Sequence, residues 1–135
     1  MKKILVIDGQ GGKLGAMVVS RLKDSNAQIT AVGTNSIATL AMLKAGADIG
    51  ATGENPVTVN CCDADVIIGP IGIVISDALH GEITPRMAQA VGQARAEKVL
   101  LPINRCNTHI AGVQDMPIGD LIELAVARVK YLVNK

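Results

Sequence analysis

The chain has 135 residues, of which 49% are apolar and 19% are charged, and its formal net charge is +1. This length suits one domain, 1–135, and the apolar content excludes an intrinsically disordered chain. The chain has one Tyr and neither Phe nor Trp, so it lacks the aromatic platforms that stack on single-stranded nucleic acid. A charge near zero gives no general attraction to nucleic acid or to acidic membranes, and we expect neither as a partner.

The sequence also indicates where the protein works and how it assembles. The longest uncharged apolar run, 66–75, is broken by two glycines and a proline and falls far short of the roughly 18 residues of a membrane span. The apolar run near the N-terminus ends at Asp8 after four residues, too few for a signal peptide. An odd number of cysteines with an adjacent pair, Cys61 and Cys62, is no disulfide framework, so we expect a cytoplasmic protein with reduced thiols. The excess of apolar residues in so small a chain predicts a homo-oligomer.

The first half of the chain predicts two strands, each followed by a helix. Residues 4–7 and 28–32 predict the strands, and the first is continuously apolar, as in a strand buried on both faces. Apolar residues recur with helical spacing after each strand, at Leu14, Met17, Val18 and Leu22 and again at Ile37, Leu40, Ala41 and Leu43. Gly46 is well placed to end the second helix.

The middle of the chain is less regular. Residues 49–51 predict a short strand. Residues 57–61 have strand propensity, but only four residues separate them from the next apolar run, 66–68, too few for a parallel crossover. The segment is either a hairpin arm or a short helical connection, and we favour the helix because 63–68 has the pattern of a helix end that feeds a strand. The apolar segment 71–80 predicts a short buried helix.

The last part of the chain predicts a helix, a strand and a long helix. Thr84 and Pro85 form a typical helix start, with an N-cap followed by proline at the first position. Residues 99–103 predict a buried strand. The C-terminal helix carries a regular apolar stripe at Ile118, Leu121, Ile122, Ala125, Val129 and Leu132. These units together predict an α/β, Rossmann-like doubly wound fold, with a mostly parallel sheet of about five strands and helices on both faces.

Four glycine-rich or polar segments directly follow predicted strands, at 8–15, 33–36, 69–72 and 104–107. Ligands of open parallel sheets bind at the carboxyl ends of the strands, so we expect these segments to share one edge. Their convergence predicts a binding site for a nucleotide or another phosphorylated small molecule. The candidate binding residues are Gly9, Gln10, Gly11, Gly12, Lys13, Gly15, Gly33, Thr34, Asn35, Ser36, Gly69, Gly72, Asn104 and Arg105.

The first of these segments carries the main signal. Gly9, Gly11 and Gly15 form G-x-G-x-x-x-G, a relative of the dinucleotide loop in which glycines approach a phosphate and the next helix supplies free N–H groups. The alternative is a tight turn whose glycines serve only the backbone geometry. In NAD-binding proteins an acidic residue after the second strand holds the ribose, and this chain has none at that position. The pattern therefore favours NADP, FMN or a mononucleotide over NAD and does not decide between them. Asp8 sets a carboxylate beside the proposed phosphate, which is repulsive unless a metal ion or a proton intervenes.

The remaining polar segments each allow two interpretations. Lys13 precedes Leu14 where a P-loop has Ser or Thr, which argues against an NTPase. Residues 34–36 either cap a helix or contact a phosphate or ribose. Arg105 either holds a phosphate or carboxylate or forms a surface ion pair, and Cys106 beside it is interpreted as an inert thiol. We expect no metal site, because no second cluster of ligands accompanies Asp77, His80 and Glu82.

Several of these segments resemble a family of bacterial proteins of unknown function, over nearly the whole chain: 7–12, 32–39, 69–74, 81–85 and 102–107. The resemblance implies a small, stand-alone, Rossmann-like cytosolic protein and brings no activity with it. A fainter similarity is to methylglyoxal synthase-like domains, whose phosphate loop and polar strand end would correspond to 33–35 and 104–105. The loop 9–15 departs from that pattern towards the Rossmann one, and the catalytic carboxylates of those domains have no clear match here.

Three functions follow as hypotheses. The first is a module that binds a nucleotide or another phosphorylated small molecule. The second is an enzyme of the lyase or isomerase type, methylglyoxal synthase-like, acting on a small phosphorylated metabolite, with Asp8 as base or metal ligand and Arg105 and Thr34 clamping the phosphate. The third is an oligomeric structural or regulatory protein without a ligand.

Overall fold

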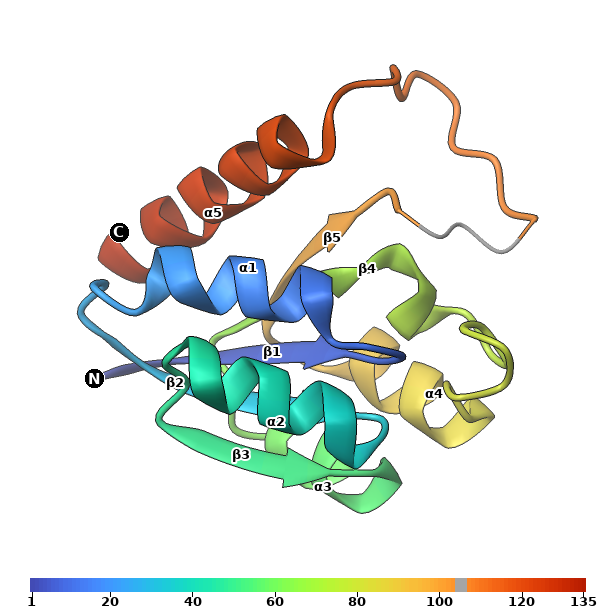
Figure 1. The fold of residues 1–135 in the computed structure, drawn as a ribbon, viewed down its shortest axis with the longest axis horizontal. Coiled ribbons are helices and arrows are strands. Elements are labelled where there is room, and N and C mark those ends of the chain that lie inside the picture. Colours follow the sequence, from blue (N-terminus) through green and yellow to red (C-terminus); the bar gives the residue numbers. More distant parts are fainter. Residues whose placement is uncertain (104–106) are drawn as a thin grey trace.

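The computed structural model describes residues 1–103 and 107–135. In this part of the chain five strands form a sheet whose neighbours are all parallel, in the order β3-β2-β1-β4-β5 (Figure 1). The strands are β1 (Lys2–Asp8), β2 (Ala27–Gly33), β3 (Ile49–Thr52), β4 (Val66–Pro70) and β5 (Glu97–Leu101). The helices are α1 (Lys13–Leu22), α2 (Ser36–Ala45), α3 (Glu54–Cys61), α4 (Pro85–Gln93) and α5 (Ile118–Asn134), with a short 3₁₀ helix, η1 (Ile71–Val74). The predicted Rossmann-like α/β fold is thereby confirmed.

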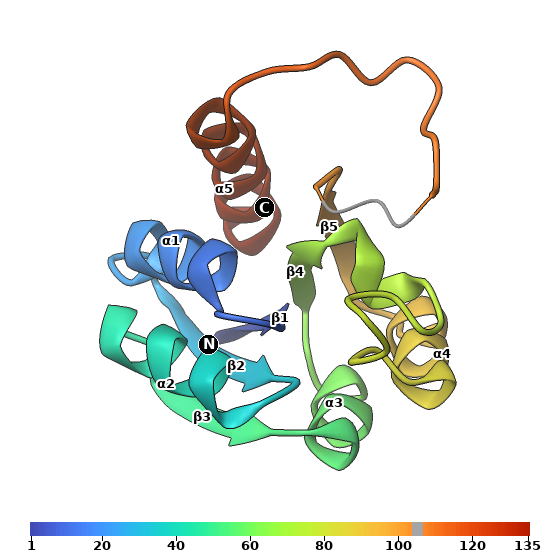
Figure 2. The ribbon, with the colours of Figure 1, turned by 45° about the vertical axis from the view of Figure 1, so that its right-hand side comes forward.

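Helices cover both faces of the sheet. Helices α1, α2 and α5 lie on one face and α3 and α4 on the other (Figure 2). Successive residues of a strand point to opposite faces, so β1 sends Ile4 and Val6 into the core beneath α1 and α5. Its Leu5 and Ile7 enter the core beneath α3 and α4. Both faces of β1 are therefore apolar, which is why its sequence is a continuous apolar run.

The chain reverses its direction across the sheet between β1 and β4. Strands β1, β2 and β3 follow one another outwards, and α3 then crosses the other face so that β4 can pair with β1 on its free side. The segment 57–61 lies in α3, so the favoured helical connection is confirmed and the hairpin arm is excluded. This reversal creates a topological switch point at the carboxyl ends of β1 and β4, the usual ligand position of such sheets.

The predicted helix caps are confirmed. Asn35 caps α2, because its side-chain oxygen accepts a hydrogen bond from the backbone N–H of Ala38 at 2.9 Å. Gly46 ends the same helix with a φ of 121°, a left-handed conformation that favours glycine. Thr84 caps α4 by accepting a hydrogen bond from the N–H of Met87 at 3.2 Å.

Residues 71–80 do not form the predicted buried helix. Only Ile71–Val74 are helical, as the 3₁₀ helix η1, and turns follow. Asp77, Leu79 and His80 have left-handed φ values of 66°, 57° and 56°. A run of β-branched residues followed by Ser and Asp, which bond to the nearby backbone, disfavours a continuous helix. The segment is instead a folded loop that leads from η1 to α4.

Two other details differ from the sequence pattern. The apolar residues whose spacing predicted α2 do not form its buried face, since Ile37 is 69% and Leu40 55% exposed. Helix α2 instead buries Ala38, Thr39 and Met42. The loop before α1 is in close contact with the backbone of α2 at Ala38, because a Cβ on Gly12 would lie 2.6 Å from the Ala38 Cα. The last strand spans Glu97–Leu101 rather than 99–103, since the following proline has no N–H to continue the ladder.

Candidate functional site

The carboxylate of Glu82 connects the loops that follow β1 and β2 through hydrogen bonds. Its Oε1 accepts hydrogen bonds from the backbone N–H of Gln10 at 2.7 Å and from the hydroxyl of Thr34 at 2.5 Å. A third, longer bond comes from the side-chain amide of Asn35 at 3.3 Å. The same amide donates to the carbonyl oxygen of Gln10 at 2.9 Å. Donors from two strand ends therefore converge on one anionic oxygen that a third segment supplies.

Asp8, the last residue of β1, lies beneath this cluster and is buried, with 6% of its surface exposed. Its two carboxylate oxygens accept hydrogen bonds from the N–H of Gly9 at 2.8 Å and from that of Gly15 at 2.7 Å. Gly15 lies in the first turn of α1, where helix geometry leaves N–H groups without intrahelical partners. Asp8 thus supplies an internal anion to the start of α1 and ties the glycine-rich loop to β1.

The two carboxyl groups differ in how readily they take up a proton. Burial raises the pKa of Asp8, the two backbone hydrogen bonds oppose the rise, and the negative charge of Glu82 adds to it, so the pKa lies above its ordinary value. Burial also acts to raise the pKa of Glu82, but the hydrogen bonds from Thr34, Gln10 and Asn35 outweigh it and hold the pKa below its ordinary value. Asp8 is therefore the better proton acceptor of the pair.

The glycines of the first loop serve different purposes. A Cβ on Gly9 would lie 2.6 Å from both Glu82 Oε1 and Thr34 Oγ1, so this glycine is required for the close approach of the two loops. Gly12 has a φ of 72° and faces the backbone of α2. A Cβ on Gly11 would meet nothing within 4 Å. Gly11 is thus free of the packing constraints on Gly9 and Gly12, and the space above it is open.

The other predicted site residues lie near this edge to differing degrees. Lys13 is exposed as the first residue of α1, and Ser36 begins α2. Gly33 ends β2, packed tightly under the first turn of α2. Gly69 lies in β4 against the backbone of β1, and Gly72 is buried in η1. Asn104, Arg105 and Cys106 lie outside the described residues.

Sequence reasoning missed the part that Glu82 plays. It considered this residue only as a metal ligand, and in the described residues no group of three or more His, Cys, Asp or Glu is arranged to hold a metal ion. Glu82 is separated by 72 residues from Gln10 and by 48 from Thr34, so no local pattern links them.

Among residues 1–103 and 107–135, no helix is both long and apolar enough to span a membrane.

Comparison with known proteins identifies the family. Residues 3–134 match the model of a domain of unknown function, DUF3842, which confirms the resemblance to a family of unknown function. The search of curated proteins gave no match. Among solved structures, the chain is similar to the dodecameric FMN-dependent UbiX-like decarboxylase from Escherichia coli O157:H7, with 15% identity and a TM-score of 0.46 over 100% of this chain and 95% of that one. That score is too low to support an inference about ligand, activity or assembly. The chain belongs to the DUF3842 domain family.

Proposed function

We propose that the protein binds a nucleotide or another phosphorylated small molecule at the carboxyl edge of the sheet. In this proposal a phosphate oxygen of the ligand takes the position of Glu82 Oε1. The observation that carries the proposal is the convergence of three donors, from Gln10, Thr34 and Asn35, on that one oxygen. Backbone N–H, hydroxyl and amide donors are the groups that commonly hold phosphate oxygens.

Neighbouring groups suit the same ligand. The N–H groups of Lys13 and Leu14 lie in the first turn of α1, where no intrahelical acceptor exists and the helix dipole favours negative charge. The Lys13 side chain adds an exposed positive charge. Glu82 is only half-buried, so a ligand can displace its carboxylate into water. Gly33, Ser36, Gly69, Gly72, Asn104 and Arg105 stay part of the proposed site as further contacts, and the identity of the cofactor stays open between NADP, FMN and a mononucleotide.

A dye-based thermal-shift panel tests the proposal. The panel contains NAD, NADP, FMN, ATP, inorganic phosphate and triose phosphates, each with and without magnesium. A ligand at a hundred times its dissociation constant adds about 2.7 kcal/mol to the free energy of unfolding, which raises the melting temperature by several degrees in a domain of this size. We expect a shift with at least one phosphorylated compound.

Two variants connect such a shift to the site. Gly11→Val fills the open space above the loop and should abolish the shift, whereas Gly92→Val, at another glycine with open space, should leave it unchanged. Glu82→Ala removes the competing carboxylate and should enlarge the shift. A panel without any shift, or a shift that Gly11→Val and Glu82→Ala both leave unaltered, would refute the proposal.

A second function, an enzyme of the lyase or isomerase type acting on a phosphorylated metabolite, is favoured by one observation. Asp8 is a buried carboxyl group with a raised pKa at a strand end, the environment in which carboxylates act as general bases. Asp8→Asn should then abolish turnover of a triose phosphate while preserving its binding. Unchanged turnover in this variant would remove Asp8 from the mechanism.

We also propose that the protein is a homo-oligomer that uses the outer surface of α2 and the edge strand β3. Ile37 is 69%, Leu40 55% and Leu43 38% exposed on α2, and the neighbouring edge strand β3 offers unpaired backbone groups. Size-exclusion chromatography with light scattering should give a multiple of the chain mass. The double variant Ile37→Lys/Leu40→Lys should give the monomer, and Leu124→Lys, an equally exposed site on α5, should not. A monomeric wild type would contradict the proposal. It would also contradict the third hypothesis, an oligomeric structural or regulatory protein without a ligand.

The proposed location is the cytoplasm. Cys61 and Cys62 are free thiols, the first buried and the second exposed. An exposed free thiol beside a second cysteine suits a reducing compartment, where it does not form mixed disulfides.

A further inference from the structure

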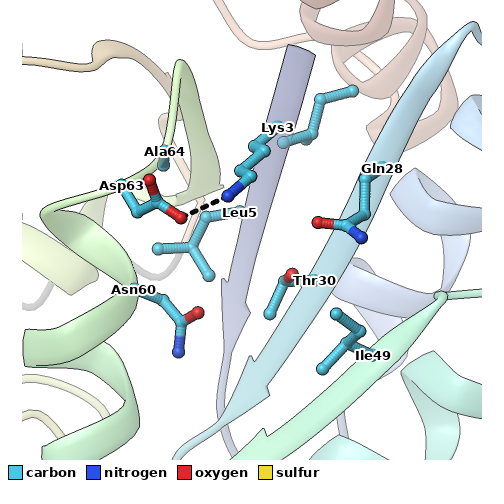
Figure 3. Close-up of a pocket in the computed structure, with 9 residues that line it drawn as sticks. Lys3, Leu5, Gln28, Thr30, Ile49, Asn60, Asp63 and Ala64 are labelled. Carbon is cyan, nitrogen blue, oxygen red and sulfur yellow. Dashed lines mark hydrogen bonds and ion pairs between the residues drawn. The ribbon is translucent and has the colours of Figure 1, made fainter. Parts of the chain in front are cut away.

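A polar cavity lies at the opposite, amino-terminal end of the sheet, on the face that α3 partly covers (Figure 3). It has a volume of about 150 Å³, and its walls come from the starts of β1, β2 and β3 and from the end of α3. Gln28 in the cavity and Gly33 at the candidate site lie five residues apart on β2, about 17 Å at the rise of an extended strand. The cavity shares none of its lining residues with the cluster around Glu82.

Thr30 is the central residue of this cavity. The residue is 9% exposed, and the next residue of β2 on the same face is the buried Val32. The Thr30 hydroxyl has no hydrogen-bond partner among residues 1–103 and 107–135, and Figure 3 shows it facing the cavity. The hydroxyl is accessible from the cavity rather than sealed in the core. It can therefore donate a hydrogen bond to, or accept one from, a molecule that enters the cavity.

Two carboxamide side chains lie on either side of Thr30. Those of Gln28 and Asn60 point towards it from β2 and from α3 (Figure 3). The Asn60 amide donates to the carbonyl oxygen of Pro56 at 2.8 Å, which leaves its Oδ1 as an acceptor on the cavity side. The Gln28 carboxamide can both donate and accept. The cavity therefore presents donors and acceptors together, within reach of one small molecule.

The cavity carries no net charge. Lys3 Nζ and the carboxylate of Asp63 form an ion pair on its wall and neutralise each other. Leu5 and Ile49 add apolar surface on opposite sides of Thr30 (Figure 3). An ionic ligand would find no unpaired countercharge here, whereas an uncharged ring would meet apolar contacts on its faces and polar contacts at its edge.

We propose that this cavity binds a small uncharged ring that carries amide groups, of the size of a pyrimidine base. A volume of about 150 Å³ holds a single six-membered ring and is well below the roughly 300–1,000 Å³ of sites for larger ligands. Ring N–H groups would donate to Asn60 Oδ1, and ring carbonyl groups would accept from Gln28 and from the Thr30 hydroxyl. Carboxamide side chains pair with the edges of nucleobases in the same way. This site goes beyond the proposed phosphate site and does not depend on it.

A ¹H–¹⁵N NMR titration of the full chain with uracil tests the proposal. We expect saturable shifts of the backbone amide signals of Gln28, Thr30 and Asn60. 1,3-Dimethyluracil has the same ring without N–H donors and should bind at least tenfold more weakly. Thr30→Val removes the hydroxyl at constant shape and should weaken uracil binding about tenfold, whereas Thr30→Ser retains the hydroxyl and should bind as the wild type does.

Three results would overturn the proposal. The first is the absence of saturable shifts, as expected of a cavity that holds only water. The second is uracil binding that Thr30→Val leaves unchanged. The third is a set of shifts centred on Gln10 and Thr34, which would assign uracil to the carboxyl edge instead. Gly11→Val separates the two proposals, because it should abolish the phosphate-ligand response and leave the uracil titration unchanged.

Discussion

Replacing Glu82 by alanine tests the central contact of the candidate site through stability alone. The substitution removes the acceptor of three hydrogen bonds, from Gln10, Thr34 and Asn35. Each hydrogen bond to a charged acceptor contributes about 1.5–3 kcal/mol when it is shielded from water. Glu82 is half-buried, so water replaces much of what is lost, and the relief of repulsion on Asp8 offsets a further part. We expect a net loss of about 2 kcal/mol, which lowers the melting temperature by roughly 8 °C in a chain of this length.

The dependence of this loss on pH identifies its origin. The pKa of Glu82 in the folded state lies below its ordinary value of 4.5. A lowered carboxyl pKa stabilises the fold above the ordinary pKa, and this stabilisation disappears as the pH falls through the folded-state pKa. The difference between the wild type and Glu82→Ala should therefore be complete at pH 7 and shrink steadily below about pH 4.5.

Thermal and urea unfolding followed by circular dichroism measures the difference at both ends of this range. Glu123→Ala, at an exposed position on α5, is the matched control and should change stability by less than about 0.5 kcal/mol. The reasoning is refuted if Glu82→Ala is as stable as the control at pH 7. It is equally refuted if the full difference persists in acid, because the lost contacts would then not depend on the carboxylate charge.

Two further predictions concern packing and thiol chemistry. Gly33→Ala should lower the free energy of unfolding in urea by about 1–3 kcal/mol, because the new Cβ would collide with the backbone of α2 at Thr39. Gly11→Ala, the control, should change the free energy of unfolding by less than about 0.5 kcal/mol. Equal losses at both glycines would contradict this packing. In the native state Cys62 should react with iodoacetamide and Cys61 should not, as peptide mass mapping would show. Cys61 is 3% exposed and burial raises its pKa to about 11. Comparable labelling of both cysteines would contradict this prediction and show that α3 opens readily.

The sequence predicted the sheet well because parallel strands buried on both faces must be continuous apolar runs. Residues 4–7, 28–32 and 66–68 all lie in strands of the sheet. The glycines and polar residues that follow β1 and β2 meet at one edge because parallel strands end on the same side. The crossover rule also decided that 57–61 is a helix, since β4 must return to the free side of β1. These features depend on local pattern and on the connection rules of parallel sheets.

The sequence could not predict contacts between residues that local pattern does not relate. The outward direction of Ile37 and Leu40 depends on the packing of Ala38, on the opposite side of α2, against the loop before α1. The folded loop in place of a helix at 71–80 depends on several left-handed residues that tertiary packing holds in place.

Composition, periodicity and turn chemistry thus determined the order of the elements, the direction of the strands and the edge at which polar residues gather. Only the tertiary structure decided that a carboxylate from the loop before α4, Glu82, lies between the ends of β1 and β2. It also decided that Thr30 opens on a cavity that α3 leaves at the other end of β2. The physical reason is that strand and helix propensities act over a few residues, whereas Glu82 lies 72 residues from Gln10 and 48 from Thr34 in the chain.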